Sequence, residues 1–200
     1  MSAGIAYELR NIGKDAAGQQ DKQEETQIQD RYAVFDTMSE DWGAEDVEGF
    51  TLYEIPEEYE RTGGYFPEKM QIYTYCVCRQ YGVSYELVIA MIERESGYIF
   101  DEVGDDGNSI GYMQIYESCH KDRMERLGCN DLKNPYQNII VGVDYLAELL
   151  EKYDTRDALA AYNYGAKGAR EHLWSNGIHL YDYNREIMKR MTEIEEELQE

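Results

Sequence analysis

Residues 85–96 read YELVIAMIERES, and this stretch decides the fold. Its apolar side chains recur three and four residues apart, which predicts a helix with one buried face. That face comprises Leu87, Val88, Met91 and Ile92. Ser84 is a favoured N-cap residue and Gly97 is favoured just beyond a helix end, so these two residues mark the limits of the helix.

A carboxylate continues this buried face at the last turn of the predicted helix. Glu95 follows Met91 by four residues, whereas Glu93 is displaced from Glu95 by about 160° around the helix axis. Burial disfavours a charged carboxylate, and the negative end of the helix dipole does the same. Both effects raise the pKa of Glu95, which favours a role as a general acid.

The sequence after residue 66 has a helical period almost throughout. Residues 99–111 are rich in Gly, Asp and Asn, so they predict an irregular loop. No run alternates between apolar and polar residues, and we therefore expect no substantial sheet. The predicted fold class is all-α, with six or seven helices. Further helices are expected to begin at Pro67, Tyr112 and Pro135, and after caps at Thr155 and Asp182.

Charge divides the chain near residue 62. Acidic side chains far outnumber basic ones before this point, and few apolar residues there are periodic. We therefore expect an acidic N-terminal extension over residues 1–62, which is disordered over about 1–30. The helical domain is expected to occupy residues 63–200.

The charge of the whole chain limits its partners. The 41 acidic and 19 basic residues give a net charge of −22, which disfavours binding to nucleic-acid phosphates and anionic lipid headgroups. The sequence has no stretch of about 20 apolar residues, the length that a membrane span requires, so no membrane span is predicted. The first residues lack a basic segment followed by an apolar run, so no signal peptide is visible and the export route is open. The 19 tyrosines suit packing in the core and also packing against sugar rings or peptides.

The sequence predicts neither a metal site nor a cofactor. Residues 101–108 read DEVGDDGN, which is acidic but lacks the ligand spacing of a helix–loop–helix calcium site. The cysteines form no zinc pattern. Cys119 and Cys129 could close a loop in an oxidising compartment, and four free thiols are the alternative.

Three blocks of sequence, in order, carry a family resemblance. They are ESG at 95–97, GNSIGYMQI at 107–115 and AYNYG at 161–165. Together they resemble the lytic transglycosylase (SLT) domain family of the lysozyme-like superfamily. The resemblance runs from about Pro67 to Met188 and implies a lysozyme-like helical domain with a substrate cleft. It also implies a substrate, the glycan strands of bacterial peptidoglycan, and a site of action in the cell wall, outside the cytoplasm.

The resemblance also implies roles for particular residues. Glu95 would be the catalytic acid and base, cleaving the bond between N-acetylmuramic acid and N-acetylglucosamine with formation of a 1,6-anhydro ring. Tyr183 would position that glutamate. The other residues that the resemblance assigns to substrate binding are Ser96, Tyr112, Met113, Gln114, Tyr162 and Asn163.

Two departures and two alternatives accompany the resemblance. Tyr112 stands where the family has leucine, and Tyr164 stands where it commonly has a small residue.

Asp105 resembles a candidate second carboxylate of goose-type lysozymes, which hydrolyse the same bond with water. A further aspartate of those enzymes is replaced by Tyr116 here. The other alternative is a glycan-binding or assembly component of a secretion, conjugation or phage machine. The acidic extension favours such a protein partner, because an anionic cell wall would repel it.

Overall fold

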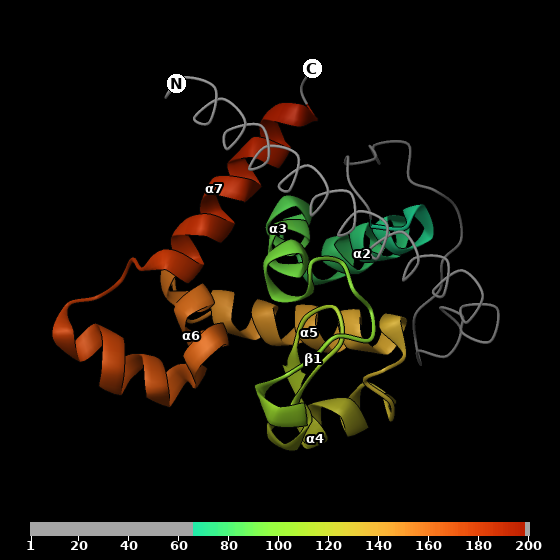
Figure 1. The fold of residues 1–200 in the computed structure, drawn as a ribbon, viewed down its shortest axis with the longest axis horizontal. Helices are drawn as coiled ribbons and strands as arrows, with labels where there is room; N and C mark the ends of the chain where they lie inside the picture. The colour runs from blue at the N-terminus through green and yellow to red at the C-terminus, as the bar shows by residue number, and fades with distance from the viewer. Residues whose placement is uncertain (1–65, 199–200) are drawn as a thin grey trace, which may run out of the picture. The chain divides into compact units, whose positions relative to one another are not determined.

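The computed structural model describes residues 66–198, which form six α-helices and one small antiparallel sheet (Figure 1). The predicted helical fold class is therefore confirmed for this part of the chain. The acidic extension over 1–62, and its expected disorder over about 1–30, lie outside the described residues. The helices are α2 (Glu68–Tyr81), α3 (Tyr85–Ser96), α4 (Glu117–Arg126), α5 (Pro135–Leu150), α6 (Thr155–Gly168) and α7 (Asp182–Glu197). Within this part, no helix is both long and apolar enough for a membrane span.

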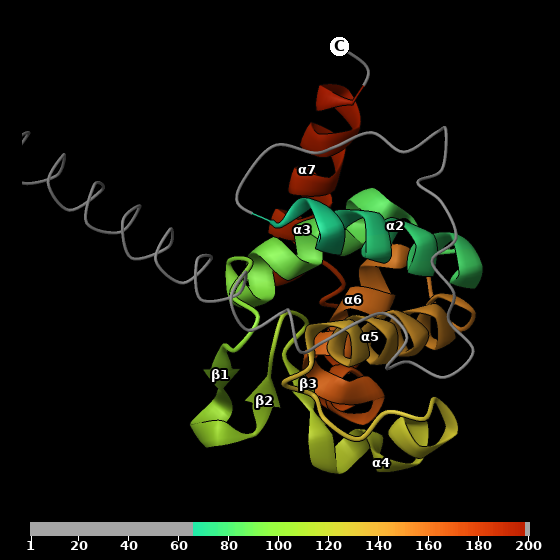
Figure 2. The same cartoon turned by 90° about the vertical axis from the view of Figure 1, so that its right-hand side faces the viewer.

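Helix α5 is the centre of the core. Most of its residues are buried, because α2, α4, α6 and the sheet all pack against it (Figure 2). The helix begins where the sequence predicts, since the Asn134 side chain accepts hydrogen bonds from the amides of Tyr136 and Gln137. Its fully buried residues include Ile139, Val143 and Leu146, the apolar stripe visible in the sequence.

Helix α3 has the predicted limits. The Ser84 hydroxyl accepts a hydrogen bond from the Leu87 amide at 3.0 Å, and Gly97 ends the helix in the left-handed conformation. Helix α7 packs along α3, although the two helices are far apart in the sequence (Figure 1). This packing places residues of the last helix beside the C-terminal end of α3.

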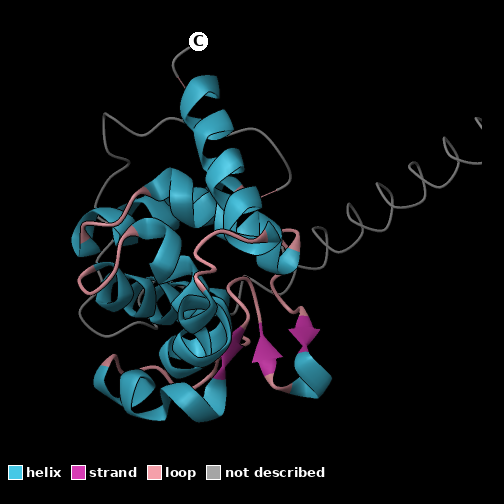
Figure 3. Ribbon diagram, turned by 90° about the vertical axis from the view of Figure 1, so that its left-hand side faces the viewer, coloured by secondary structure: helices cyan, strands magenta, loops and turns pink. Residues whose placement is uncertain are grey.

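The segment between α3 and α4 differs from the expected loop and early helix. It contains strands β1 (Val103–Gly104), β2 (Ser109–Ile110) and β3 (Ile115–Tyr116), which pair antiparallel in that order (Figure 3). A 3-10 turn, η2 (Asp105–Gly107), joins the first two strands. The strands are two residues long, too short to show an alternating pattern in the sequence.

The helix predicted to begin at Tyr112 begins instead at Glu117. The backbone explains the delay, because Gly111 has φ 75° and Gln114 has φ 47°, and neither value is compatible with a right-handed helix. Between them the chain turns, and Ile115 then pairs with Ile110 across the sheet. The predicted helix was therefore wrong over its first five residues.

Three other helix starts differ by one residue from the predictions. Pro67 is the N-cap of α2 rather than its first residue, with ψ 137°. Asp154, not Thr155, caps α6 and accepts a hydrogen bond from the Asp157 amide at 2.9 Å. Tyr181, not Asp182, is the N-cap of α7. At α6, the adjacent residues Asp154 and Thr155 both have cap-forming side chains, and sequence alone does not rank them.

Buried Asn138 on α5 holds the sheet against the core. Its Oδ1 accepts a hydrogen bond from the Met113 amide at 2.9 Å, and its Nδ2 donates to the carbonyls of Ile110 and Leu132 at 2.7 and 3.0 Å. A side chain at Gly111 would collide with this amide, so glycine is required there for its size as well as for its positive φ. One amide thus satisfies three backbone groups, two of which lie outside the helices and strands.

We expect Asn138→Ala to lower the free energy of unfolding by about 2–4 kcal/mol, because it leaves buried backbone groups without partners. Asn176→Ala is the matched control, since exposed Asn176 donates one hydrogen bond to the His172 carbonyl; it should change the value by about 0.5 kcal/mol or less. Urea unfolding of both variants measures the difference. Equal, small losses would show that Asn138 does not support the sheet.

Candidate active site

A cleft of about 410 Å³ opens beside the C-terminal end of α3. Its walls come from α3, the sheet, α4, α5 and α6, so residues from across the domain meet there. The lining residues are Glu95, Asp105, Ser109, Gln114, Ile115, Tyr116, Cys119, His120, Tyr145 and residues 162–165. Of the residues singled out from the sequence, the cleft brings together Glu95, Asp105, Gln114, Tyr162 and Asn163.

Glu95 is the half-buried carboxylate of this cleft. Burial raises its pKa to about 7, from an ordinary value of 4.5. The hydrogen bond from Tyr183 and the charge of Arg94 oppose this rise, whereas the nearby charge of Asp105 adds to it. Near neutral pH, about half of the Glu95 carboxyls therefore carry a proton, as a general acid requires.

Tyr183 reaches Glu95 from the first turn of α7. Its hydroxyl donates a hydrogen bond to Oε1 of Glu95, and the phenol is itself buried. Buried Asn184 fixes this turn, because its Nδ2 donates to the carbonyls of Arg156 and His179 at 3.0 and 2.9 Å. Tyr183 thus lies where the sequence analysis places it, in contact with the candidate acid.

Glu93 lies outside the cleft. Its Oε2 accepts hydrogen bonds from the Tyr98 hydroxyl at 2.7 Å and from Nε of Arg190 at 2.9 Å. Arg190 belongs to α7, so this carboxylate joins α3 to α7 by an ion pair. The two glutamates of the last turn of α3 therefore have different surroundings, as their helical spacing predicts.

The side chain of Gln114 lies on the cleft wall and is bonded to the sheet region. Its Nε2 donates to the carbonyls of Glu102 and Gly111 at 3.2 and 3.0 Å. Its Oε1 lies close to Gly104, where a Cβ would approach it within 2.5 Å. Gly104 and Gly111 therefore make room for the side chains of Gln114 and Asn138.

Tyr162 and Asn163 project from α6 into the cleft. The Tyr162 hydroxyl donates to the Met113 carbonyl at 2.9 Å, and burial together with the nearby charge of Glu95 raises the pKa of this phenol. Oδ1 of Asn163 accepts a hydrogen bond from the Tyr181 hydroxyl at 3.1 Å. These groups are uncharged, so they add no charge next to Glu95.

Three residues assigned to substrate binding do not line the cleft. Ser96 is buried, and its hydroxyl donates to the Ile92 carbonyl at 3.0 Å. The side chains of Tyr112 and Met113 are fully buried, so the expectation that they form a cleft wall is wrong. Met113 fits against Gly142 of α5, where no Cβ could be accommodated. Met113 bears on the site through its backbone, whose amide donates to Asn138 and whose carbonyl accepts from Tyr162.

Asp105 lines the cleft from the start of the η2 turn. Its backbone has φ 48°, an uncommon value for a residue with a side chain. Its Oδ2 accepts a hydrogen bond from the Ser109 hydroxyl at 2.6 Å, which holds the carboxylate across the base of the turn. The structure thus places a second carboxylate on the same cleft as Glu95.

Comparison with known proteins identifies the family. The Transglycosylase SLT domain matches residues 77–180, which is more than half of the chain. The chain belongs to this family. The match covers α3, the cleft and α6, so the predicted family is confirmed.

The fold of this SLT domain is also that of a solved relative. The X-ray structure of an inactive glutamate-to-glutamine mutant of lytic transglycosylase Slt from Pseudomonas aeruginosa matches with a TM-score of 0.57. The sequences are 20% identical over the match, which covers 67% of this chain and 25% of the relative. The lysozyme-like helical fold is confirmed by this match, and the chain corresponds to about a quarter of that protein's length.

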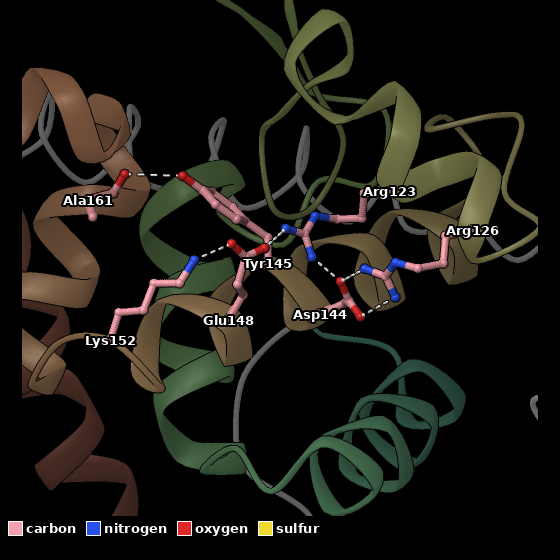
Figure 4. A network of polar contacts seen from close by, with 7 residues as sticks. All are labelled: Arg123, Arg126, Asp144, Tyr145, Glu148, Lys152 and Ala161. Carbon is pink, nitrogen blue, oxygen red and sulfur yellow. Dashed lines mark hydrogen bonds and ion pairs between the residues drawn. The ribbon is translucent and has the colours of Figure 1, made fainter.

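One wall of the SLT domain cleft depends on a polar network between α4 and α5 (Figure 4). Arg123 of α4 donates hydrogen bonds to Asp144 and Glu148 of α5. Its guanidinium carbon also lies 5.2 Å from the ring centroid of Tyr145. The Tyr145 hydroxyl in turn donates to the Ala161 carbonyl at 3.2 Å, beside the predicted site residues of α6. The network therefore joins α4, α5 and α6 behind the cleft.

Sequence reasoning missed the residues of this wall. Tyr145 and His120 line the cleft, with their ring centroids 4.5 Å apart. Burial and the charge of Arg123 lower the pKa of His120 to about 4, so its imidazole is neutral at neutral pH. Tyr145 interrupts the apolar sequence of α5, which is the one signal that could have drawn attention to it. His120 lies in a polar helix and has no such signal.

The cysteines of the SLT domain are all free thiols. Cys119 is exposed on the cleft, whereas Cys129 is buried. The two do not form a disulfide in this structure, which has the four free thiols of the second alternative. Among residues 66–198, no group of three His, Cys, Asp or Glu side chains is arranged to hold a metal ion.

The raised pKa of Glu95 predicts a pH-dependent effect of Glu95→Gln on stability. The folded protein holds this proton more tightly than the unfolded chain, so the stabilisation is complete below pH 4.5 and is lost as the pH rises to about 7. Glutamine carries no such loss. We expect the unfolding free energy of the variant, relative to the parent, to rise by about 3 kcal/mol between pH 4.5 and 8.

Urea unfolding of both proteins across this pH range measures the change. Glu93→Gln is the control, because it removes a carboxylate that is paired with Arg190, and it should gain no stability as the pH rises. A difference between Glu95→Gln and the parent that stays constant with pH would contradict burial as the cause.

Proposed function

We propose that this SLT domain is a lytic transglycosylase that cleaves the glycan strands of bacterial peptidoglycan. The bond cleaved joins N-acetylmuramic acid to N-acetylglucosamine, and the product ends in 1,6-anhydro-muramic acid. The observation that carries the proposal is Glu95 in the cleft, with its pKa raised to about 7 and its carboxyl bonded to Tyr183. The name of the Pseudomonas relative, a lytic transglycosylase described as inactive after a glutamate-to-glutamine change, agrees with it.

The first step transfers the proton of Glu95 to the oxygen of the glycosidic bond. The bond from this oxygen to the anomeric carbon of the muramic acid breaks, and N-acetylglucosamine leaves with the oxygen as a free hydroxyl. The acetamido oxygen of the muramic acid attacks the anomeric carbon at the same time and forms a cyclic intermediate. Carboxyl burial favours the starting state of this step, because it keeps Glu95 protonated near neutral pH, although the same burial disfavours the charge left after the transfer. The Tyr183 hydroxyl then stabilises the carboxylate by hydrogen bonding.

The second step uses Glu95 as the base. Its carboxylate takes the proton of the C6 hydroxyl of the same sugar, and O6 attacks the anomeric carbon to close the anhydro ring. The bond to the acetamido oxygen breaks, and Glu95 is protonated again for the next cycle. No water is consumed, so one carboxyl is sufficient. Gln114, Tyr162 and Asn163 are the uncharged groups that line the cleft around the sugar.

A second candidate function is hydrolysis of the same bond, and Asp105 is the observation that favours it. This carboxylate lines the same cleft as Glu95 and contributes to its raised pKa. An inverting hydrolase uses such a second carboxylate to activate water. Against this reading, Asp105 is engaged by the Ser109 hydroxyl, and Tyr116 lines the cleft where goose-type enzymes have a further aspartate.

The proposed substrate places the site of action in the cell wall, outside the cytoplasm. A protein partner that binds the acidic extension over 1–62 remains a prediction, and so does an assembly role in a larger machine. Both concern residues outside the described part of the chain.

Glu95→Gln should reduce release of soluble fragments from purified peptidoglycan by on the order of a thousandfold, because the amide cannot donate the proton. Glu93→Gln, displaced by about 160° around the helix axis from the cleft carboxyl, should keep most of the activity. The parent should lose activity as the pH rises above about 7, where Glu95 becomes charged. Equal losses in the two variants would show that Glu95 is not the acid.

The products distinguish cleavage without water from hydrolysis. We expect mass analysis to show fragments with anhydro ends, lighter by one water than hydrolytic fragments, and without heavy oxygen from labelled water. Asp105→Asn should then reduce activity only severalfold. Incorporation of the label, together with a loss in Asp105→Asn as large as that in Glu95→Gln, would instead establish the hydrolase.

A further inference from the structure

A row of tyrosines leads from Glu95 along the ends of α6 and α7. The Tyr183 ring, whose hydroxyl contacts Glu95, lies roughly parallel to the Tyr181 ring, with centroids 6.2 Å apart and planes 19° apart. The Tyr181 ring meets the Tyr164 ring edge-on, with centroids 5.8 Å apart. The row therefore runs from a buried phenol at the catalytic carboxyl to an aromatic ring at the surface.

Tyr164 is the exposed member of this row. Its side chain lines the cleft, and 47% of the residue is exposed to solvent. Gly165, with φ 69°, interrupts the helical conformation directly after Tyr164. The ring is thus held against Tyr181 at a break in α6, with much of its surface uncovered.

The polar groups beside this ring are uncharged. Oδ1 of Asn163 accepts a hydrogen bond from the Tyr181 hydroxyl, which fixes the orientation of the Asn163 amide. Its Nδ2 donates to no group within residues 66–198, so it is available to a ligand carbonyl. Together, Tyr164, Tyr181 and Asn163 form what we call the tyrosine ledge. An exposed ring beside a free amide donor matches the apolar face and the acetamido carbonyl of an N-acetylhexosamine.

We propose that the tyrosine ledge is a binding position for a second N-acetylhexosamine ring of the glycan strand, next to the bond that Glu95 cleaves. The proposal rests on the proposed function, because it takes the cleft to be a saccharide site. It adds a specificity residue, Tyr164, at a position where the family commonly has a small side chain. The ring of Tyr164 packs on the sugar face, and Nδ2 of Asn163 donates to the acetamido oxygen.

The ledge acts on binding and not on proton transfer. Its exposed ring is separated from the Glu95 carboxyl by Tyr181 and Tyr183 along the row. Removal of the Tyr164 ring should therefore weaken the hold on the strand in the ground state and the transition state alike. Loss of binding that is equal in the two states raises KM and leaves kcat nearly unchanged.

The test measures binding in the full chain that carries Glu95→Gln, with N-acetylglucosamine oligomers of increasing length as the ligands in calorimetry. Three further substitutions are compared in this background. Tyr164→Ala removes the ring, and Tyr164→Phe keeps it. Leu180→Ala is the matched control, because Leu180 is also 47% exposed and precedes the ledge residue Tyr181 but does not line the cleft.

We expect Tyr164→Ala to weaken binding of the longer oligomers by about tenfold, and Tyr164→Phe and Leu180→Ala to bind as the parent does. In the active chain, Tyr164→Ala should raise KM for soluble glycan strands with little change in kcat. Parent-like binding of all oligomers by Tyr164→Ala would overturn the ledge while leaving the proposed function intact. If the parent itself binds no oligomer, the saccharide cleft and the ledge are both wrong.

Discussion

The hydrogen bond from the Tyr183 hydroxyl to the Glu95 carboxyl is the contact on which the site depends. It joins the end of α3 to the start of α7, which are separated by most of the described chain. For the two groups to meet, α7 must pack along α3 and its first turn must be fixed. Asn184 provides that fixation with two backbone hydrogen bonds, one of them to the start of α6 at Arg156. The site is therefore a consequence of how three helices close against one another.

A second buried asparagine does the same for the opposite side of the cleft. Asn138 of α5 bonds the backbone on both sides of the Gly111 turn, and it thereby holds Gln114 and the sheet in place. Amide side chains suit this task because each can donate and accept at once, which irregular backbone requires. They also add no charge. Two neutral amides thus position the cleft walls without competing with the electrostatics of Glu95.

The sequence predicts the parts of this structure that depend on local order. Periodicity and capping residues predict the limits of α3, the start of α5 and the face that carries Glu95. The structure has all three as predicted. The three strands were missed because a two-residue strand has no period, and because its geometry comes from the positive φ of Gln114 and from Asn138 in a distant helix. Tyr112 and Met113 were expected on the cleft wall but are buried. A block of residues can be characteristic of a family because it packs against the core, and the sequence does not distinguish this from contact with substrate.

The electrostatic balance at Glu95 is between burial, which raises its pKa, and two partners that lower it, Tyr183 and Arg94. Without partners, a carboxyl this buried would hold its proton too tightly to act as an acid near neutral pH. With a buried cation as close as Tyr183, it would be charged and unable to donate. A phenol is intermediate, because it donates a hydrogen bond without carrying charge. Tyrosine at residue 183 therefore keeps the pKa of Glu95 near 7, as the proposed mechanism requires of a group that gives a proton in one step and accepts one in the next.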